Sequence, residues 1–218
     1  TDQLVNCSAM VFILPFFLFS ALFGQFADKY EKAMQIRRVK LLEVVIMLLA
    51  TLGFWLDNVP LLMFVLFLLG LQSTIFGPIK YGILPRILKR EELVGGNALI
   101  EMGTFVAILG GTIAGPQLAG IEASWPYWAS AACLAVAVAG YLFSLRIPAS
   151  PAVAPDLEIS WNIFTETVRN MKFINQNRTV LNSVLGISWF WFFGAIFLVQ
   201  IPSYTQNVQG GDKHLMSA

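Results

Sequence analysis

The sequence predicts an all-α, polytopic membrane protein: a bundle of six spanning helices with one further amphipathic helix in the membrane interface. Of its 218 residues, 57% are hydrophobic and only 12% are charged, whereas a soluble domain carries about 25% charged residues. A helix needs about 20 apolar residues to cross the hydrocarbon core. Long runs without Asp, Glu, Lys or Arg occur at residues 3–27, 58–79, 102–121, 123–145 and 179–211.

The basic residues are distributed asymmetrically between the charged patches. Thirteen of the 14 Lys and Arg residues lie in alternate patches, at residues 28–43, 80–92 and 146–178. The opposite gaps hold acidic residues and the lone Lys213. Short loops rich in Lys and Arg stay on the cytoplasmic side of a membrane. We therefore expect the basic loops to be cytoplasmic and both ends of the chain to lie outside.

Each apolar run defines one span of this layout. The second span is the least apolar, because only residues 44–56 of it lack charge and Glu43 lies in its first turn. Pro202 is expected to end the sixth span. The predicted spans are 4–26, 39–56, 61–83, 94–119, 126–146 and 179–201.

Residues 148–178 connect the fifth and sixth spans. Pro148, Pro151 and Pro155 exclude a continuous helix through the first part of this segment. Residues 161–178 have helical periodicity with an apolar and a charged face, as in a helix lying in the interface plane. We therefore divide the chain into a five-span bundle at 1–147, a cytoplasmic linker with an amphipathic helix at 148–178, and a further span with an outer tail at 179–218.

Several classes of function are excluded by what the sequence lacks. It has no P-loop, G-x-S-x-G or H-E-x-x-H motif, and its single histidine, His214, lies in the tail. Cys7 and Cys133 both lie in apolar runs and are read as small buried hydrophobes. A net charge of +1 does not favour nucleic-acid binding. We expect a segment that is not an enzyme and that holds no metal or cofactor.

Small residues recur every fourth position along the fourth span. Residues at this spacing let helices approach closely in lipid. The pattern fits ordinary helix packing, and it also fits a seam along which helices slide during a conformational change. The residues of this stripe are Gly103, Ala107, Gly111 and Gly115, followed by Pro116.

Ionisable residues within spans are candidates for function, because charge is costly in the bilayer. Three occur, Glu43, Lys80 and Glu101. For Lys80 and Glu101, a structural ion pair and a substrate contact both remain open. Other candidates for a substrate pathway are the polar Gln72 and Asn97 and the aromatic Trp189 and Trp191 near the middle of the sixth span.

The first charged patch carries a specific motif. Gly24, Asp28 and Lys29, with Arg37 and Arg38 further on, resemble the G-x-x-x-D-[RK]-x-G-[RK]-[RK] signature of the major facilitator superfamily, with Glu31 at its second glycine. The resemblance implies a turn that latches one conformation of a transporter. Residues 111–116 are similar to the G-x-x-x-G-P signature of the superfamily's fifth helix.

Longer runs at residues 76–85, 93–104 and 187–195 resemble the lysophospholipid transporters within this superfamily, including transporter domains fused to an acyltransferase. The resemblance implies that the six spans are helices 2–7 of 12. It also implies alternating-access movement of a lysophosphatidylethanolamine-like lipid across the bacterial inner membrane, and an acyltransferase partner, fused or separate. The alternative is a drug or metabolite/proton antiporter, which the fifth-helix signature favours.

Overall fold

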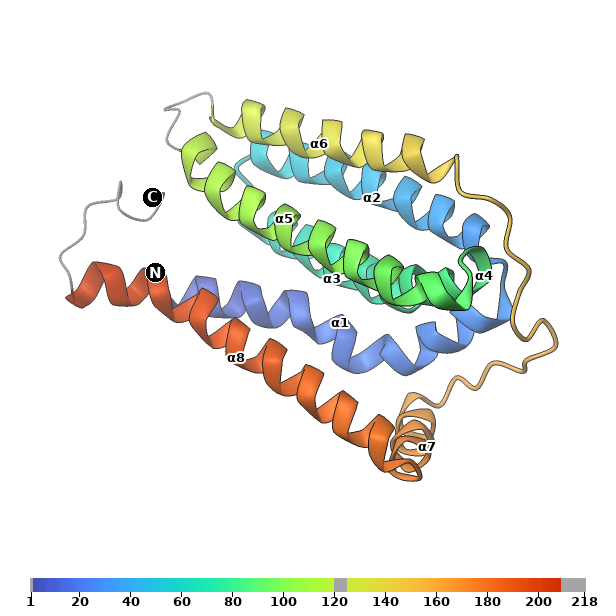
Figure 1. Ribbon diagram of the computed structural model, residues 1–218. Coiled ribbons are helices and arrows are strands. Elements are labelled where there is room, and N and C mark those ends of the chain that lie inside the picture. Colours follow the sequence, from blue (N-terminus) through green and yellow to red (C-terminus); the bar gives the residue numbers. More distant parts are fainter. Residues whose placement is uncertain (1, 120–124, 209–218) are drawn as a thin grey trace. The chain divides into compact units, whose positions relative to one another are not determined.

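The computed structural model describes residues 2–119 and 125–208, and every regular element in these ranges is helical (Figure 1). The chain divides into two compact units, Thr1–Ile163 and Phe164–Ala218. The predicted all-α class is confirmed. The helices are α1 (Asp2–Lys29), α2 (Lys32–Trp55), α3 (Val59–Gly82), α4 (Leu84–Ile87), the 3₁₀ helix η1 (Arg90–Glu92), α5 (Leu93–Ala119), α6 (Trp125–Ser144), α7 (Ile163–Asn175) and α8 (Arg178–Val208).

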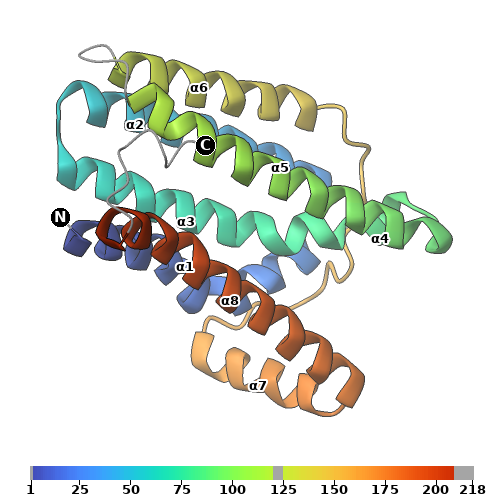
Figure 2. The same ribbon diagram turned by 60° about the vertical axis from the view of Figure 1, so that its left-hand side comes forward.

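Each of the six predicted spans coincides with one of the long helices α1, α2, α3, α5, α6 and α8. All of these except α2 contain a stretch long and apolar enough to cross a membrane. The basic half of α2 is too highly charged for that criterion, but α2 packs lengthwise against both α3 and α6 (Figures 1 and 2). Its neighbours therefore shelter polar groups that lipid would not accept.

The last helix differs from the prediction. Helix α8 continues through Pro202 to Val208, so Pro202 does not end it. A proline removes one intrahelical hydrogen bond, and long membrane helices tolerate that loss. Of the predicted outer tail at 203–218, residues 203–208 are helical and the remainder lies outside the described residues.

Within the first unit, α3 lies between α1 and α2, and α6 covers the other side of α2 (Figure 2). Helix α3 approaches α1 closely at Gly70, where a Cβ atom would lie 2.2 Å from the Phe12 carbonyl oxygen. Only glycine fits such a contact.

The buried core of this unit consists of two apolar clusters. The cluster at the basic end is formed by Ala27, Ile36, Val39, Ile79 and Ile83. The cluster in the middle of the bundle is formed by Ile46, Ala50 and Val65.

The turns of the first unit are fixed by helix caps. The Glu31 carboxylate caps α2 by accepting hydrogen bonds from the backbone N–H groups of Ala33 and Met34. At the other end of the bundle, the Asn58 side chain caps α3, and Asp57 has a positive φ of 47° in the turn before it. The α1–α2 turn, α4 with η1, and the start of the α6–α7 linker all lie at one end (Figure 1). The topology thus brings the basic patches of this unit together.

The second unit contains α7 and α8. Asn177 caps α8 by accepting hydrogen bonds from the backbone N–H groups of Thr179 and Val180. In α7, the apolar Phe164, Val168 and Met171 are exposed. This exposure fits the amphipathic helix that the sequence predicts, and its place in the membrane interface stays a prediction.

Candidate functional site

Lys80 lies at the basic end of α3, facing α5. Its Nζ is 3.5 Å from the Thr104 hydroxyl and 4.8 Å from the centre of the Tyr81 ring. The Tyr81 hydroxyl donates a hydrogen bond to the Glu101 carboxylate. The Lys80–Glu101 ion pair, one of the two alternatives that the sequence left open, is therefore not formed in the described chain, where the Tyr81 hydroxyl bonds to the Glu101 carboxylate. The result is a cation with no acidic partner within ion-pair distance among the described residues.

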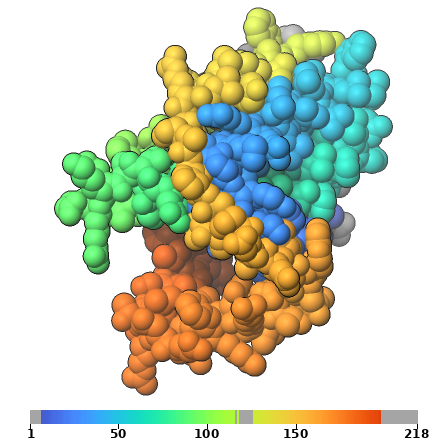
Figure 3. Space-filling view, turned by 90° about the vertical axis from the view of Figure 1, so that its right-hand side faces the viewer, coloured from blue at the N-terminus to red at the C-terminus, as the bar shows by residue number. Residues whose placement is uncertain are grey.

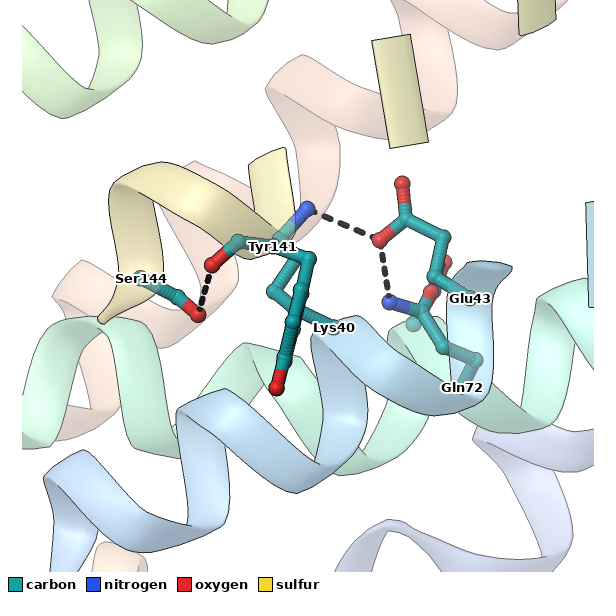
Figure 4. Close-up of polar contacts among 6 residues, drawn as sticks. Lys40, Glu43, Gln72, Tyr141 and Ser144 are labelled. Atoms are coloured by element: carbon teal, nitrogen blue, oxygen red, sulfur yellow. Dashed lines mark hydrogen bonds and ion pairs between the residues drawn. The ribbon is translucent and has the colours of Figure 1, made fainter. Parts of the chain in front are cut away.

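Gln72 does not join Lys80, although both are on α3. Its amide nitrogen donates to the Glu43 carboxylate at 2.9 Å, and the same oxygen, Oε2, is 2.8 Å from Lys40 Nζ (Figure 4). Gln72 is only 5% exposed. Lys40 also lies over the Phe76 ring, 5.0 Å from its centre. Glu43, predicted as a functional candidate, is thus part of a compact polar cluster between α2 and α3.

The signature residues of the α1–α2 turn have diverse surroundings. Asp28 is largely exposed, and its Oδ1 is 3.6 Å from Nζ of Lys32, which is itself 1% exposed. Arg37 donates to the Ile147 carbonyl oxygen at 2.9 Å, whereas Arg38 is exposed. A Cβ added at Gly24 would meet nothing within 4 Å among the described residues. A close helix contact occurs instead at Gly70, a position that the sequence analysis missed.

The other predicted residues are placed as follows. Asn97 is exposed on α5, one turn before Glu101. In the small-residue stripe, Ala107 is exposed, and a Cβ added at Gly103, Gly111 or Gly115 would meet no described atom within 4 Å. The stripe therefore makes no close helix contact within the described chain, and its role as a seam stays a prediction. Pro116 belongs to α5, but its side chain lies outside the description.

Trp189 and Trp191 belong to the second unit. They are 68% and 43% exposed, and their rings contact those of Phe192 and Phe190 in the same helix. Their pathway role stays a prediction.

Several polar residues at these sites were missed by the sequence analysis. Lys40 precedes Glu43 by three residues, a spacing at which oppositely charged side chains meet on a helix. This spacing could have predicted the Lys40–Glu43 ion pair from the sequence. Tyr81 and Thr104 carried no comparable signal, because their partners lie on another helix. Groups of three or more metal-ligating side chains are absent from residues 2–119 and 125–208.

These helices define the class of the protein: it is a multi-pass helical membrane protein whose basic residues gather at one end of the bundle. A sequence profile of the Major Facilitator Superfamily matches residues 2–218, and the chain belongs to this superfamily. It is 32% identical over 192 residues to the lysophospholipid transporter LplT of Serratia proteamaculans (strain 568). It is 31% identical to the proteins of that name from Enterobacter sp. (strain 638) and Escherichia coli O7:K1 (strain IAI39 / ExPEC).

These alignments cover 85% of the chain but only 44–45% of each relative. The chain thus spans less than half the length of the curated relatives it matches. No solved structure matches the chain. The comparisons therefore establish the superfamily of this segment.

Proposed function

We propose that the chain is part of a secondary transporter that moves a lysophospholipid, of the lysophosphatidylethanolamine type, across the bacterial inner membrane by alternating access. The similarity to proteins named lysophospholipid transporters, over 85% of the chain, supports this proposal. The basic loops would face the cytoplasm, because positive residues favour that side. The transported lysophospholipid would be delivered to an acyltransferase, fused to this protein or separate from it.

Lys80 is the observation that carries the proposal. It is a cation on an otherwise uncharged spanning helix, and the one carboxylate that the sequence suggested as its partner is held by Tyr81. Lys80 is therefore available for the phosphate of a lipid headgroup, which lysine binds as a point charge. The Tyr81 hydroxyl bonds to Oε1 of Glu101, and the other carboxylate oxygen would meet the ethanolamine group of the same lipid. The single acyl chain needs only an apolar surface, which these helices provide in abundance.

The remaining candidates have supporting roles in this proposal. The turn around Asp28 and Lys29, with Gly24, Arg37 and Arg38, would act as a latch that is made in one conformation and broken in the other. The stripe of small residues on α5 would form a smooth contact with another helix of the intact protein. Asn97, Trp189 and Trp191 would contribute to the pathway or to its walls, whereas Gln72 would stabilise the α2–α3 pair through its bond to Glu43.

The test measures uptake of radiolabelled lysophosphatidylethanolamine into spheroplasts that carry the full-length protein. We expect Lys80→Ala and Glu101→Ala to reduce uptake at normal expression. Arg90→Gln is the matched control, because it removes an exposed positive charge from the same end of the bundle. Normal uptake by both alanine variants would overturn the assigned site. If the wild-type protein does not move the lipid but exports a cationic drug against a proton gradient, the antiporter alternative is correct.

A further inference from the structure

The linker that follows α6 lies against the α1–α2 turn instead of hanging free. Figure 3 shows it as a gold strip across the blue surface of the first helices. The backbone N–H groups of Val153 and Ala154 both donate to the Asp28 carbonyl oxygen at 3.0 Å. Ser150 is 1% exposed, although it lies in an irregular segment between prolines. We call residues 147–161 the strap, and all of them belong to the first compact unit.

One carboxylate joins the strap to the turn. Glu31 Oε1 accepts hydrogen bonds from the backbone N–H of Ser150 at 2.6 Å and from that of Ala33 at 2.9 Å. Its Oε2 accepts from the backbone N–H of Met34 at 2.6 Å. Glu31 therefore caps α2 and binds the strap with the same group. The family signature has a glycine here, which offers no side chain for either contact.

The charge state of Glu31 suits this double role. Burial by itself would raise the pKa of its carboxyl group. The hydrogen bonds from Ser150, Met34 and Ala33, together with the positive charge of Arg37, outweigh that effect and lower the pKa below its usual value. The other charged groups near the turn are Lys29, Arg38 and the pair formed by Asp28 and Lys32. Glu31 is consequently ionised at neutral pH, and hydrogen bonds to an ionised acceptor are the stronger kind.

Three more side chains, which precede or follow Glu31 in the sequence, also bind the strap. Gln25 makes a reciprocal pair with Ser160, donating to its carbonyl oxygen at 3.2 Å and accepting from its N–H at 2.8 Å. The Trp161 ring meets the Phe26 ring edge-on at 6.0 Å. Arg37 holds the Ile147 carbonyl oxygen at the other end. Each polar bond goes to strap backbone, so the contacts fix its path rather than recognise its side chains.

We propose that Glu31 is a positioning residue that fastens the strap to the first bundle, so that residues 147–161 move with that bundle as one piece. One consequence of this inference rests on the proposed transport function: during transport, the chain would bend at residues that follow the strap and not within it. The fastening itself is a property of the folded protein and can be measured without substrate.

The experiment is hydrogen–deuterium exchange of the full-length protein in lipid nanodiscs, read at the Ser150 amide and at the first turn of α2. Glu31→Asp is the decisive variant, because aspartate still caps a helix but is shorter by one carbon–carbon bond, about 1.5 Å. We expect exchange at Ser150 to rise roughly tenfold, as for loss of one charge-assisted hydrogen bond. Exchange in the first turn of α2 should be unchanged.

Glu31→Gly restores the residue of the family signature and should accelerate exchange at both places. Glu158→Gln is the control, since Glu158 is an exposed acid of the strap itself, and it should change neither. Unchanged Ser150 exchange in both Glu31 variants would overturn the proposal. Gln25→Ala keeps the test informative if Glu31→Gly does not fold, because it should release the Ser160 amide alone.

Transport kinetics provide the second readout. Because Glu31 is at the turn and not among the proposed substrate contacts, Glu31→Asp should lower the maximal rate of lysophosphatidylethanolamine uptake and leave the KM unchanged. A changed KM with an unchanged maximal rate would contradict a positioning role. If the wild-type protein moves no lysophospholipid, the proposed function fails, whereas the exchange result still decides the fastening of the strap.

Discussion

Two lysines in neighbouring spanning helices, Lys40 and Lys80, have opposite surroundings. Lys40 pairs with Glu43 at 2.8 Å, and Gln72 satisfies the same carboxylate oxygen (Figure 4). Within the described chain, Lys80 has only a hydroxyl at 3.5 Å and an aromatic ring as neighbours of its ammonium group, while the nearby carboxylate is bound by Tyr81. The first cluster is complete and stabilises the bundle. The second keeps a positive charge available, which is what recognition of an anionic group requires.

The largest expected effect comes from breaking the complete cluster. Glu43→Ala leaves Lys40 without its carboxylate in a position where its side chain is 22% exposed. We expect the free energy of unfolding to fall by about 2 kcal/mol, less than for a fully buried pair. Denaturant titration of the purified protein in mixed micelles measures it. Glu101→Ala is the matched control and should cost only about 0.5 kcal/mol, so equal losses in the two variants would contradict the comparison.

The next effect separates the two lysines by function. Lys80→Gln removes the available charge, and we expect lysophosphatidylethanolamine uptake to fall roughly tenfold, equivalent to one charged hydrogen bond. Its unfolding free energy should stay within about 0.5 kcal/mol of wild type. Lys40→Gln should show the reverse pattern, with lower stability and an uptake that follows the amount of folded protein. A loss of stability in the Lys80→Gln variant would contradict the proposed difference between Lys80 and Lys40.

A smaller effect is expected at Gln72, whose side chain bonds to Glu43 in the complete cluster and which we assign to that cluster and not to the pathway. Gln72→Leu deletes one hydrogen bond to Glu43 while filling a similar volume. We expect a stability loss of about 1 kcal/mol and no change in the KM for the lipid. A raised KM, measured by uptake at several lipid concentrations, would instead assign Gln72 to the pathway.

The smallest effect tests how Lys80 is kept available. Tyr81→Phe releases Glu101, which can then turn to Lys80 and compete with the headgroup. We expect uptake to fall about threefold, which corresponds to less than 1 kcal/mol, with unchanged stability. The double variant Tyr81→Phe/Glu101→Gln removes the competing charge and should lose no more activity than Glu101→Gln alone.

The long helices were predictable from the sequence because bilayer crossing demands uninterrupted apolar runs. Helix α2 shows the limit of that signal, since its charged half is supported by α3 and α6 rather than by its own composition. The family signatures were readable for the same reason, as each is a continuous stretch. Pro202 misled the prediction, because a proline within a long membrane helix does not have to end it.

The pairing of side chains at the candidate site was not predictable in the same way. Sequence placed Gln72, Lys80 and Glu101 in one set, whereas the structure turns Gln72 toward α2 and Lys80 toward α5. That choice depends on how each helix is rotated about its axis, which its neighbours decide. The Gly70 crossing and the strap depend on residues far apart in the chain, so no local pattern contained them.

The strap has a consequence for how this segment varies. Its anchors are main-chain atoms of Ile147, Ser150, Val153, Ala154 and Ser160, so most side chains between them are free to be exchanged. The length of the strap is constrained, because deleting one residue would move every later backbone amide out of reach of its hydrogen-bond partner. Variation here should accordingly consist of substitutions, with insertions and deletions confined to positions beyond Trp161.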